Sequence, residues 1–153
     1  MEAVTNRQAR YDYELLEKYE AGLVLRGHEV KSVKAGQINL TGSYITVKHG
    51  ERPELFLINA NISKYKAAGT LPDYSPTRSR KLLLNRREIL SILNKIKAQS
   101  LTIVPTRVYT RNNRVKVEFA LARGKKLFDK RQSIKEREGK REVSRALKTT
   151  TRG

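Results

Sequence analysis

The chain has 153 residues, and its 33 Lys and Arg outnumber its 15 Asp and Glu, so that the formal net charge is +18. A chain of this length fits one domain, or one domain with a tail. It contains no cysteine, which excludes disulfides, cysteine-ligated zinc sites, iron–sulfur clusters and cysteine nucleophiles. So basic a surface attracts polyanions, and nucleic acid is the expected partner.

Membranes are not an expected partner. No apolar run approaches the ~18 residues that a membrane-spanning helix needs, and Met1–Thr5 lack the apolar stretch of a secretory signal. No segment combines a basic face with a strongly apolar one, as a helix lying on an anionic membrane does. We therefore expect a cytoplasmic protein.

The first part of the chain predicts a strand, a short helix and a hairpin. After a polar start with no expected regular structure, alternating apolar residues favour extended chain over 11–25, and Gly22 marks a bulge or a sharp bend in it. A short helix over 27–35 ends before Gly36, a residue typical of the position after a helix. Residues 43–58 alternate on both sides of a turn and predict a hairpin.

A long basic loop and one clear helix follow. Residues 64–80 contain glycine, two prolines and several cations, and loops of this length in small domains are functional or disordered. Residues 85–98 predict a helix with Asn85 as its N-cap. Its apolar stripe consists of Ile89, Leu90, Leu93 and Ile96.

A second hairpin over residues 101–122 completes the core. Its tip, Asn112-Asn113, tolerates the positive φ of a tight turn, and Pro105 marks an edge or a bulge because it cannot donate to a ladder. Several hairpins in so small a domain favour closure, which removes exposed edges. The predicted fold is mainly β: an antiparallel β-barrel of the oligonucleotide-binding type with flanking helices. A split α+β sheet is the alternative.

The composition changes at Arg123. Residues 123–153 hold 12 Lys and Arg against 4 Asp and Glu, and their apolar residues are too sparse for a packing stripe. We expect an RNA-binding barrel domain over 1–122 and a basic tail over 123–153, disordered alone from residue 129 and helical when bound.

Catalysis is not expected. The two histidines, His28 and His49, have no metal-binding spacing, and no glycine-rich phosphate loop is present. No base or acid pair is recognisable from the sequence. The protein is therefore predicted not to be an enzyme, and no cofactor or metal is implied.

Two segments favour RNA binding. Residues 6–13 combine arginines suited to phosphate with tyrosines that can stack on unpaired bases. A second basic cluster covers Thr77–Lys81. Glu20 can accept hydrogen bonds from a base edge or from a neighbouring Asn or Arg. The alternatives stay open: Tyr13 in the core, the arginines as a solvated flank, and Glu20 merely exposed.

Five spaced motifs then resemble one family, the SmpB proteins that bind bacterial tmRNA, in a collinear match from about residue 6 to residue 148. The motifs are Asn6-Arg7-x-Ala9, Glu20-Ala21-Gly22, Gly27-x-Glu29-Val30-Lys31-Ser32, Arg80-Lys81-Leu82-Leu83-Leu84 and Gly124-Lys125-Lys126-x-x-Asp129-Lys130-Arg131. Many members have His where this chain has Tyr11; a stacking role survives this change because tyrosine keeps an aromatic face.

The resemblance implies a protein that binds the tRNA-like domain of tmRNA (SsrA RNA) and escorts it into stalled ribosomes. There the tail occupies the decoding region of the small subunit and the empty mRNA channel. Leu82–Leu84 would support the RNA-contacting surface. The predicted ribosome-engaging tail residues are Asp129, Lys130, Arg131, Ile134 and Lys135. The predicted RNA contacts are Asn6, Arg7, Arg10, Tyr11, Tyr13, Glu20, Lys31, Lys34, Arg78, Arg80, Lys81, Lys125 and Lys126.

Two other functions are compatible with the charge. A structural ribosomal protein would stay on washed ribosomes at unit occupancy, and a general nucleic-acid-binding protein would also bind duplex DNA. We expect a monomer whose barrel carries the affinity for tmRNA and whose tail carries acceptance by the ribosome.

Overall fold

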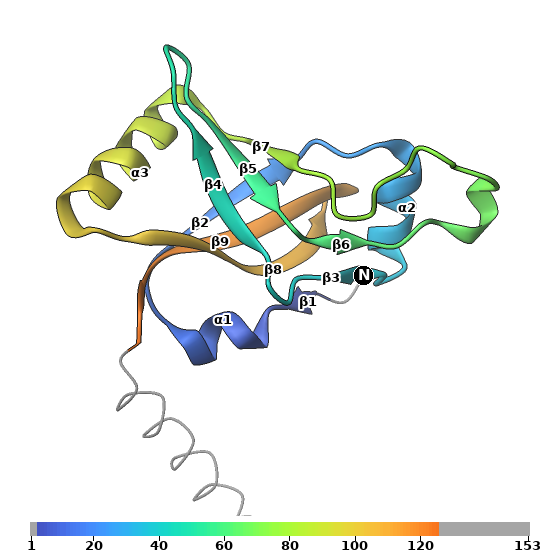
Figure 1. Ribbon diagram of the computed structural model, residues 1–153, viewed down its shortest axis with the longest axis horizontal. Helices are drawn as coiled ribbons and strands as arrows, with labels where there is room; N and C mark the ends of the chain where they lie inside the picture. The colour runs from blue at the N-terminus through green and yellow to red at the C-terminus, as the bar shows by residue number, and fades with distance from the viewer. Residues whose placement is uncertain (1–2, 126–153) are drawn as a thin grey trace, which may run out of the picture. The chain divides into compact units, whose positions relative to one another are not determined.

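The computed structural model of the chain describes residues 3–125 (Figure 1). The chain divides after Arg123 into two units, and the barrel belongs to the first. In chain order the elements are β1 (Val4–Thr5), α1 (Arg7–Asp12), β2 (Tyr13–Leu23), α2 (Gly27–Lys34), β3 (Ile38–Asn39), β4 (Tyr44–Lys48), β5 (Glu54–Ile58), β6 (Asn61–Ile62), the 3-10 helix η1 (Lys66–Ala68), β7 (Arg80–Leu83), α3 (Arg86–Gln99), β8 (Thr102–Arg111) and β9 (Arg114–Gly124).

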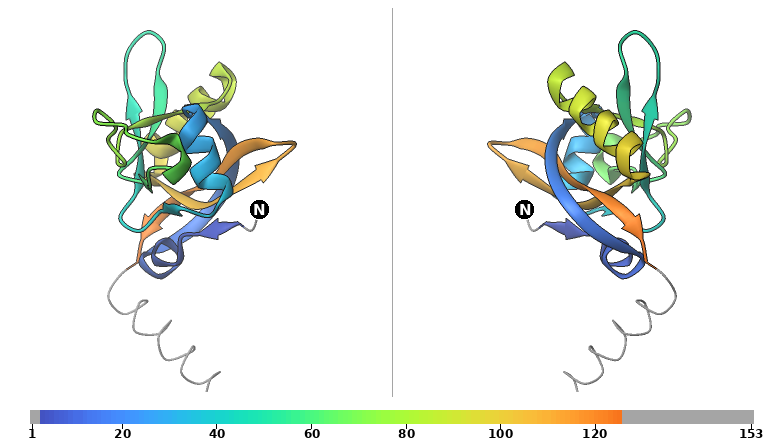
Figure 2. Two further views of the ribbon diagram at one scale, coloured as in Figure 1. Left: turned by 90° about the vertical axis from the view of Figure 1, so that its right-hand side faces the viewer. Right: turned by 90° about the vertical axis from the view of Figure 1, so that its left-hand side faces the viewer.

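The six longer strands close into a barrel. They follow the order β8-β4-β5-β7-β2-β9, and β9 pairs back with β8. Strand β1 adds to β8, while β3 and β6 form a separate antiparallel pair. The three α-helices lie outside the barrel (Figures 1 and 2). The predicted mainly β barrel with flanking helices is thereby confirmed, and the split α+β alternative is wrong.

Alternation along the strands fills the barrel with one row of side chains from each strand. The ring of Phe119 is fully buried and stacks on that of Tyr19, with 5.6 Å between centroids. Helix α3 covers the barrel with Ile89 and Ile92, while Leu90, predicted in its apolar stripe, is 42% exposed. Other fully buried apolar residues are Val33, Leu55, Leu57, Ala60, Ile62, Val108, Val117, Ala120 and Ala122.

The β8–β9 hairpin has the predicted tip and bulge. Asn112 and Asn113 both have positive φ, at 52° and 62°, and close a two-residue turn between Arg111 and Arg114. The register of the two strands shifts between Pro105 and Arg107, so that Thr106 is the extra residue of a bulge.

The predicted start of the first strand is wrong. Residues 7–12 form α1, and β2 begins only at Tyr13. The reason is the cap: the Asn6 side chain accepts a hydrogen bond from the Ala9 backbone N–H at 3.3 Å, and this local stabilisation outweighs the alternation of aromatic residues. Strand β1 orders residues that were expected to be irregular.

Two further expectations change. Gly22 does not form a bulge: it pairs with Leu83, and an added Cβ would lie 3.4 Å from the Leu83 side chain, so glycine permits a close approach of β2 to β7. The long loop predicted over 64–80 contains η1, and at Arg80, paired with Leu57, it is already strand β7.

Candidate nucleic-acid interface

Helix α1 is fixed to the barrel through Asn6 and the bulge of β8. The bulge leaves two carbonyls free of the ladder: the Asn6 backbone N–H donates to Thr106 O at 2.7 Å, and its Nδ2 donates to Pro105 O at 2.9 Å. Its Oδ1 caps α1, and the residue is buried. Asn6, predicted to contact RNA, therefore uses its amide inside the protein, where it positions α1.

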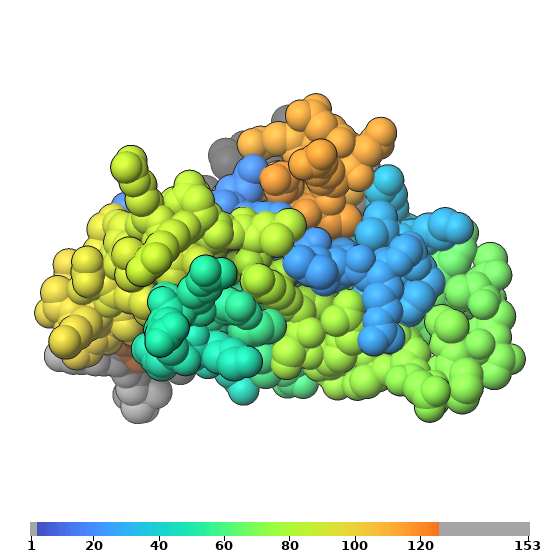
Figure 3. Space-filling view, turned by 90° about the horizontal axis from the view of Figure 1, so that it is seen from above, coloured from blue at the N-terminus to red at the C-terminus, as the bar shows by residue number. Residues whose placement is uncertain are grey.

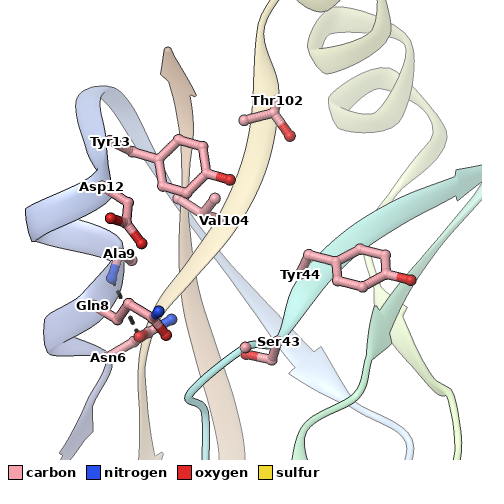
Figure 4. Close-up of a pocket in the computed structure, with 10 residues that line it drawn as sticks. Asn6, Gln8, Ala9, Asp12, Tyr13, Ser43, Tyr44, Thr102 and Val104 are labelled. Atoms are coloured by element: carbon pink, nitrogen blue, oxygen red, sulfur yellow. Dashed lines mark hydrogen bonds between the residues drawn. The ribbon is translucent and has the colours of Figure 1, made fainter. Parts of the chain in front are cut away.

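Helix α1 forms one wall of a hollow of about 490 Å³. Tyr13 lies on this wall, and Tyr44 of β4 lies on the opposite one (Figure 4). Arg7 and Arg10 are exposed on the helix, and Tyr11 is half-buried. A tyrosine ring can stack on an unpaired base, and an arginine can bind its phosphate. The other lining residues are Asn6, Gln8, Ala9, Asp12, Gly42, Ser43, Thr102 and Val104.

A second cluster joins Glu20 of β2 to the outer half of β8. The Tyr109 hydroxyl donates to Glu20, and Arg111 Nη1 donates to the same carboxylate at 3.1 Å. The Arg107 and Arg111 guanidinium carbons lie 4.7 and 5.7 Å from the centroid of the Tyr109 ring. Burial and the hydrogen bond to Glu20 raise the pKa of Tyr109 to about 12.

This cluster, Glu20, Arg107, Tyr109 and Arg111, keeps cations at the surface: the Arg111 side chain is 61% exposed. The prediction that Glu20 accepts a hydrogen bond from a neighbouring Arg is confirmed. Sequence reasoning missed the other three residues. Their spacing, i, i+2 and i+4 on one strand, was the available signal, because it places all three on one face.

A third cluster, Glu29, Tyr74, Arg78 and Arg80, lies inside the protein. The Glu29 carboxylate is fully buried and accepts hydrogen bonds from Arg80 at 2.6 and 3.0 Å, from Arg78, and from the Tyr74 hydroxyl at 3.2 Å. Burial would raise the pKa of Glu29, but the bonds from Arg78, the Arg26 backbone N–H and Arg80 prevail and lower it to about 2.

The prediction of a direct contact between Arg80 and RNA is therefore wrong. Its guanidinium is fully buried and also donates to Ala60 O at 2.7 Å and to Pro76 O at 2.9 Å. Arg78 is only partly exposed and paired. These arginines hold the loop between β6 and β7 against α2. The basic run after the loop therefore did not indicate an RNA-binding surface, because two of its cations bind a carboxylate inside the protein.

The predicted lysines lie apart from α1. Lys31 and Lys34 are exposed on α2, where Lys31 Nζ lies 5.8 Å from the centroid of the Tyr65 ring. Lys81 is exposed on β7, with its Nζ 3.6 Å from a carboxylate oxygen of Glu54. The structure thus distributes the predicted residues over several faces.

Most of the basic tail falls beyond the described part of the chain. Lys125 is half-buried at the end of that part. The remaining predicted residues, Lys126, Asp129, Lys130, Arg131, Ile134 and Lys135, lie outside the described residues. Within residues 3–125, no group of three or more acidic, histidine or cysteine side chains is arranged to hold a metal ion. The helices of this part are too short or too polar to cross a membrane.

Known proteins resemble the chain over nearly its whole length. It is 50% identical over 147 residues to an SsrA-binding protein of Roseiflexus sp. (strain RS-1), covering 96% of this chain and 91% of that protein. It is 50% identical over 143 residues to the SsrA-binding protein of Trichormus variabilis, covering 94% and 90%.

A solved structure has the same fold. It is described as "tmRNA-SmpB: a journey to the center of the bacterial ribosome", matches with a TM-score of 0.65 at 44% identity, and covers 82% of this chain and 85% of its own. The family model of the SmpB protein matches residues 3–149. This chain belongs to the SmpB family.

Proposed function

We propose that this protein binds the tRNA-like domain of tmRNA and delivers it to stalled ribosomes, where translation resumes on the tag-encoding frame. The observation that carries the proposal is identity of 50% to SsrA-binding proteins over 96% of the chain, together with the fold shared with a tmRNA–SmpB structure. The place of action is then the cytoplasm, where ribosomes work, and the protein acts by binding rather than by catalysis.

Two surfaces of the barrel support the RNA-binding half of this proposal. The α1 hollow offers Tyr13, and helix α1 itself carries the exposed Arg7 and Arg10. The Glu20 cluster offers Arg107 and Arg111 held over an aromatic ring. Guanidinium groups bind phosphates as bidentate donors, and tyrosine rings stack on splayed bases. Folded RNA is recognised in this way, by its backbone and by a few unpaired bases.

The tail is the part that we propose senses the ribosome. A segment that folds only on binding loses its conformational entropy at that step. In this proposal the tail therefore becomes ordered only where an empty mRNA channel can hold it. This divides the chain into a barrel, residues 1–122, for tmRNA affinity and a tail, residues 123–153, for acceptance by the ribosome.

Two experiments test the proposal. The affinity-tagged protein is purified from its host, and the RNA that copurifies is sequenced; tmRNA is expected to dominate, whereas ribosomal RNA, with the protein at unit occupancy on washed ribosomes, would identify a structural subunit instead.

Truncation before Asp129 should leave tmRNA affinity within about a few fold, because the phosphate contacts of the barrel remain, and should abolish peptide tagging. Loss of tmRNA binding on truncation would refute the division.

A further inference from the structure

The outer face of the barrel over β4, β5 and β7 carries two aromatic rings among polar and charged side chains. Ile45, Leu55, Leu57 and Leu82 point into the core, so their neighbours in sequence point outward. The outward residues are Tyr44, Thr46 and Lys48 on β4, Glu54, Phe56 and Ile58 on β5, and Lys81 and Leu83 on β7. Five of them that lie side by side, Tyr44, Thr46, Phe56, Ile58 and Lys81, form what we call the outer strip.

Strand register makes the outer strip continuous. Tyr44 pairs with Ile58, Thr46 pairs with Phe56, and Phe56 pairs in turn with Lys81 on the next strand. Directly opposite side chains are ~5 Å apart and diagonal ones ~7–8 Å apart. The two aromatic rings, Tyr44 and Phe56, are therefore diagonal neighbours at a spacing that consecutive unstacked nucleotides can match.

The outer strip has no cover in the described part of the chain. Figures 1 and 2 show that α1, α2 and α3 lie elsewhere around the barrel and leave the outer face of β4 and β5 open. Tyr44 is 49% exposed, and Phe56 and Ile58 remain partly exposed. A sheet face that meets only water is normally polar, so the exposed rings of Tyr44 and Phe56 on this face indicate a binding surface.

The outer strip connects two hollows. At one end, Tyr44 lines the α1 hollow. At the other, Lys81 lines a hollow of about 460 Å³ between the tip of the β4–β5 hairpin and the start of α3. Arg52, Arg86 and one carboxylate, Glu54, are also on its wall. Figure 3 shows this hairpin tip next to the start of α3 and, on the far side of the barrel, the tip of the β8–β9 hairpin.

We propose that the outer strip binds an unpaired RNA strand. Tyr44 and Phe56 would each stack on a base, and Arg52 and Arg86 would meet phosphates at one end. Lys81 would exchange the Glu54 carboxylate, 3.6 Å from its Nζ, for a phosphate. Sequence-tolerant stacking combined with cations along the backbone is how proteins hold single strands. A second copy of this chain is disfavoured, because its +18 charge repels its like and Thr46 and Lys81 interrupt the apolar area.

This inference rests on the proposed function for the identity of the polymer, and it adds a surface distinct from the Glu20 cluster, which lies around the barrel on β2 and β8. The probe is a short, fluorescently labelled oligouridylate, whose binding to the full chain is followed by anisotropy. Loss of one stacked base should weaken its affinity about 5- to 150-fold. We therefore expect losses of this size for Tyr44→Leu and for Phe56→Leu, which keep an apolar side chain but remove the ring.

The matched control is Tyr65→Leu, the same change outside the outer strip, which should bind the oligouridylate like the unmodified chain. Circular dichroism checks folding. Should Phe56→Leu unfold, the loss in Tyr44→Leu is read together with the cross-links, because Tyr44 also lines the α1 hollow. An oligonucleotide carrying 4-thiouridine should cross-link on ultraviolet irradiation to peptides of β4 and β5.

Unchanged affinity in both folded ring variants would overturn the inference that the outer strip binds RNA. Cross-links confined to α1 or to the β8–β9 hairpin would overturn it as well. If in that case the chain still captures tmRNA from its host, only this inference fails. If the oligouridylate binds through the outer strip and no tmRNA is captured, the proposed function fails and the outer strip stands.

Discussion

Two clusters in this protein contain the same residue types, one glutamate, two arginines and one tyrosine, and differ in burial. In the Glu29 cluster the carboxylate and Arg80 are fully buried, and every donor is directed to a partner inside the protein. In the Glu20 cluster the guanidinium groups of both arginines remain partly in water: Arg111 pairs with Glu20, and Arg107 pairs with Glu118.

The difference shows that burial, rather than residue type, decides what an Arg–Glu–Tyr set does. A buried carboxylate with paired arginines fixes a loop, because leaving any member unpaired is costly. A surface pair contributes little to folding, so its arginines can exchange a carboxylate for a phosphate. The Glu29 cluster has a structural role, and the Glu20 cluster is the one suited to binding a ligand.

The largest expected effect is on folding, from Glu29→Gln. This change keeps the shape but leaves the Arg80 charge buried without its counter-ion, and breaking one partner of a buried pair costs about 3–5 kcal/mol. Urea unfolding followed by circular dichroism measures the loss. The matched change Glu20→Gln, in a partly exposed pair, should cost at most about 1 kcal/mol.

The acid limb of stability provides an independent check on Glu29. Its pKa in the folded protein, about 2, lies below the ordinary value of 4.5, so its contribution is complete above pH 4.5 and is lost as the pH falls toward 2. Glu29→Gln should remove this acid-dependent part. An equal loss in the free energy of unfolding for Glu29→Gln and Glu20→Gln would show that the two clusters do not differ in their contribution to folding.

A smaller effect is expected on RNA affinity, from Arg107→Gln and Arg111→Gln. Each lost charged contact should weaken tmRNA binding about tenfold or more and lower the salt slope by about one, with little change in stability because both side chains are partly exposed. Filter binding across a salt series measures both. The control is Arg87→Gln, which changes an exposed arginine on α3. An equal loss of affinity there would mean that the Glu20 cluster contributes only its net charge and no specific contact.

The smallest effect concerns the tyrosine of the Glu20 cluster. The pKa of Tyr109 is raised from 10.0 to about 12, so stabilisation by its protonated hydroxyl is complete below pH 10 and is lost as the pH rises through 12. In an alkaline titration of tyrosinate absorbance, Tyr109→Phe should remove a transition near pH 12. Removal of a transition near pH 10 would mean that the hydroxyl does not bind Glu20 in solution.

Local patterns predicted most of the elements. Asn85 caps α3 as expected, by accepting a hydrogen bond from the Glu88 N–H at 2.9 Å, and Gly36 has the positive φ, 77°, expected after α2. The tip of the β8–β9 hairpin and the bulge at Pro105 were also predictable. These features depend on a few neighbouring residues, whose backbone preferences act over short distances.

The site was less predictable, because charge alone does not reveal burial. Arg80 and the exposed Lys81 are neighbours in one basic run, yet the alternation of β7 sends one into the core and the other to the surface. Only the partner of Arg80, 51 residues earlier in the chain, makes its burial tolerable. No local pattern contains that pairing.

The amino-acid sequence by itself determined the barrel class and the family, and it predicted a polyanionic partner, since these depend on strand periodicity, spaced motifs and net charge. The tertiary structure alone decided which charges meet solvent and which are neutralised inside, because that outcome depends on contacts between residues far apart in the chain. It placed Asn6 and Arg80 in the framework, and it brought Glu20, Tyr109 and Arg111 together at the surface.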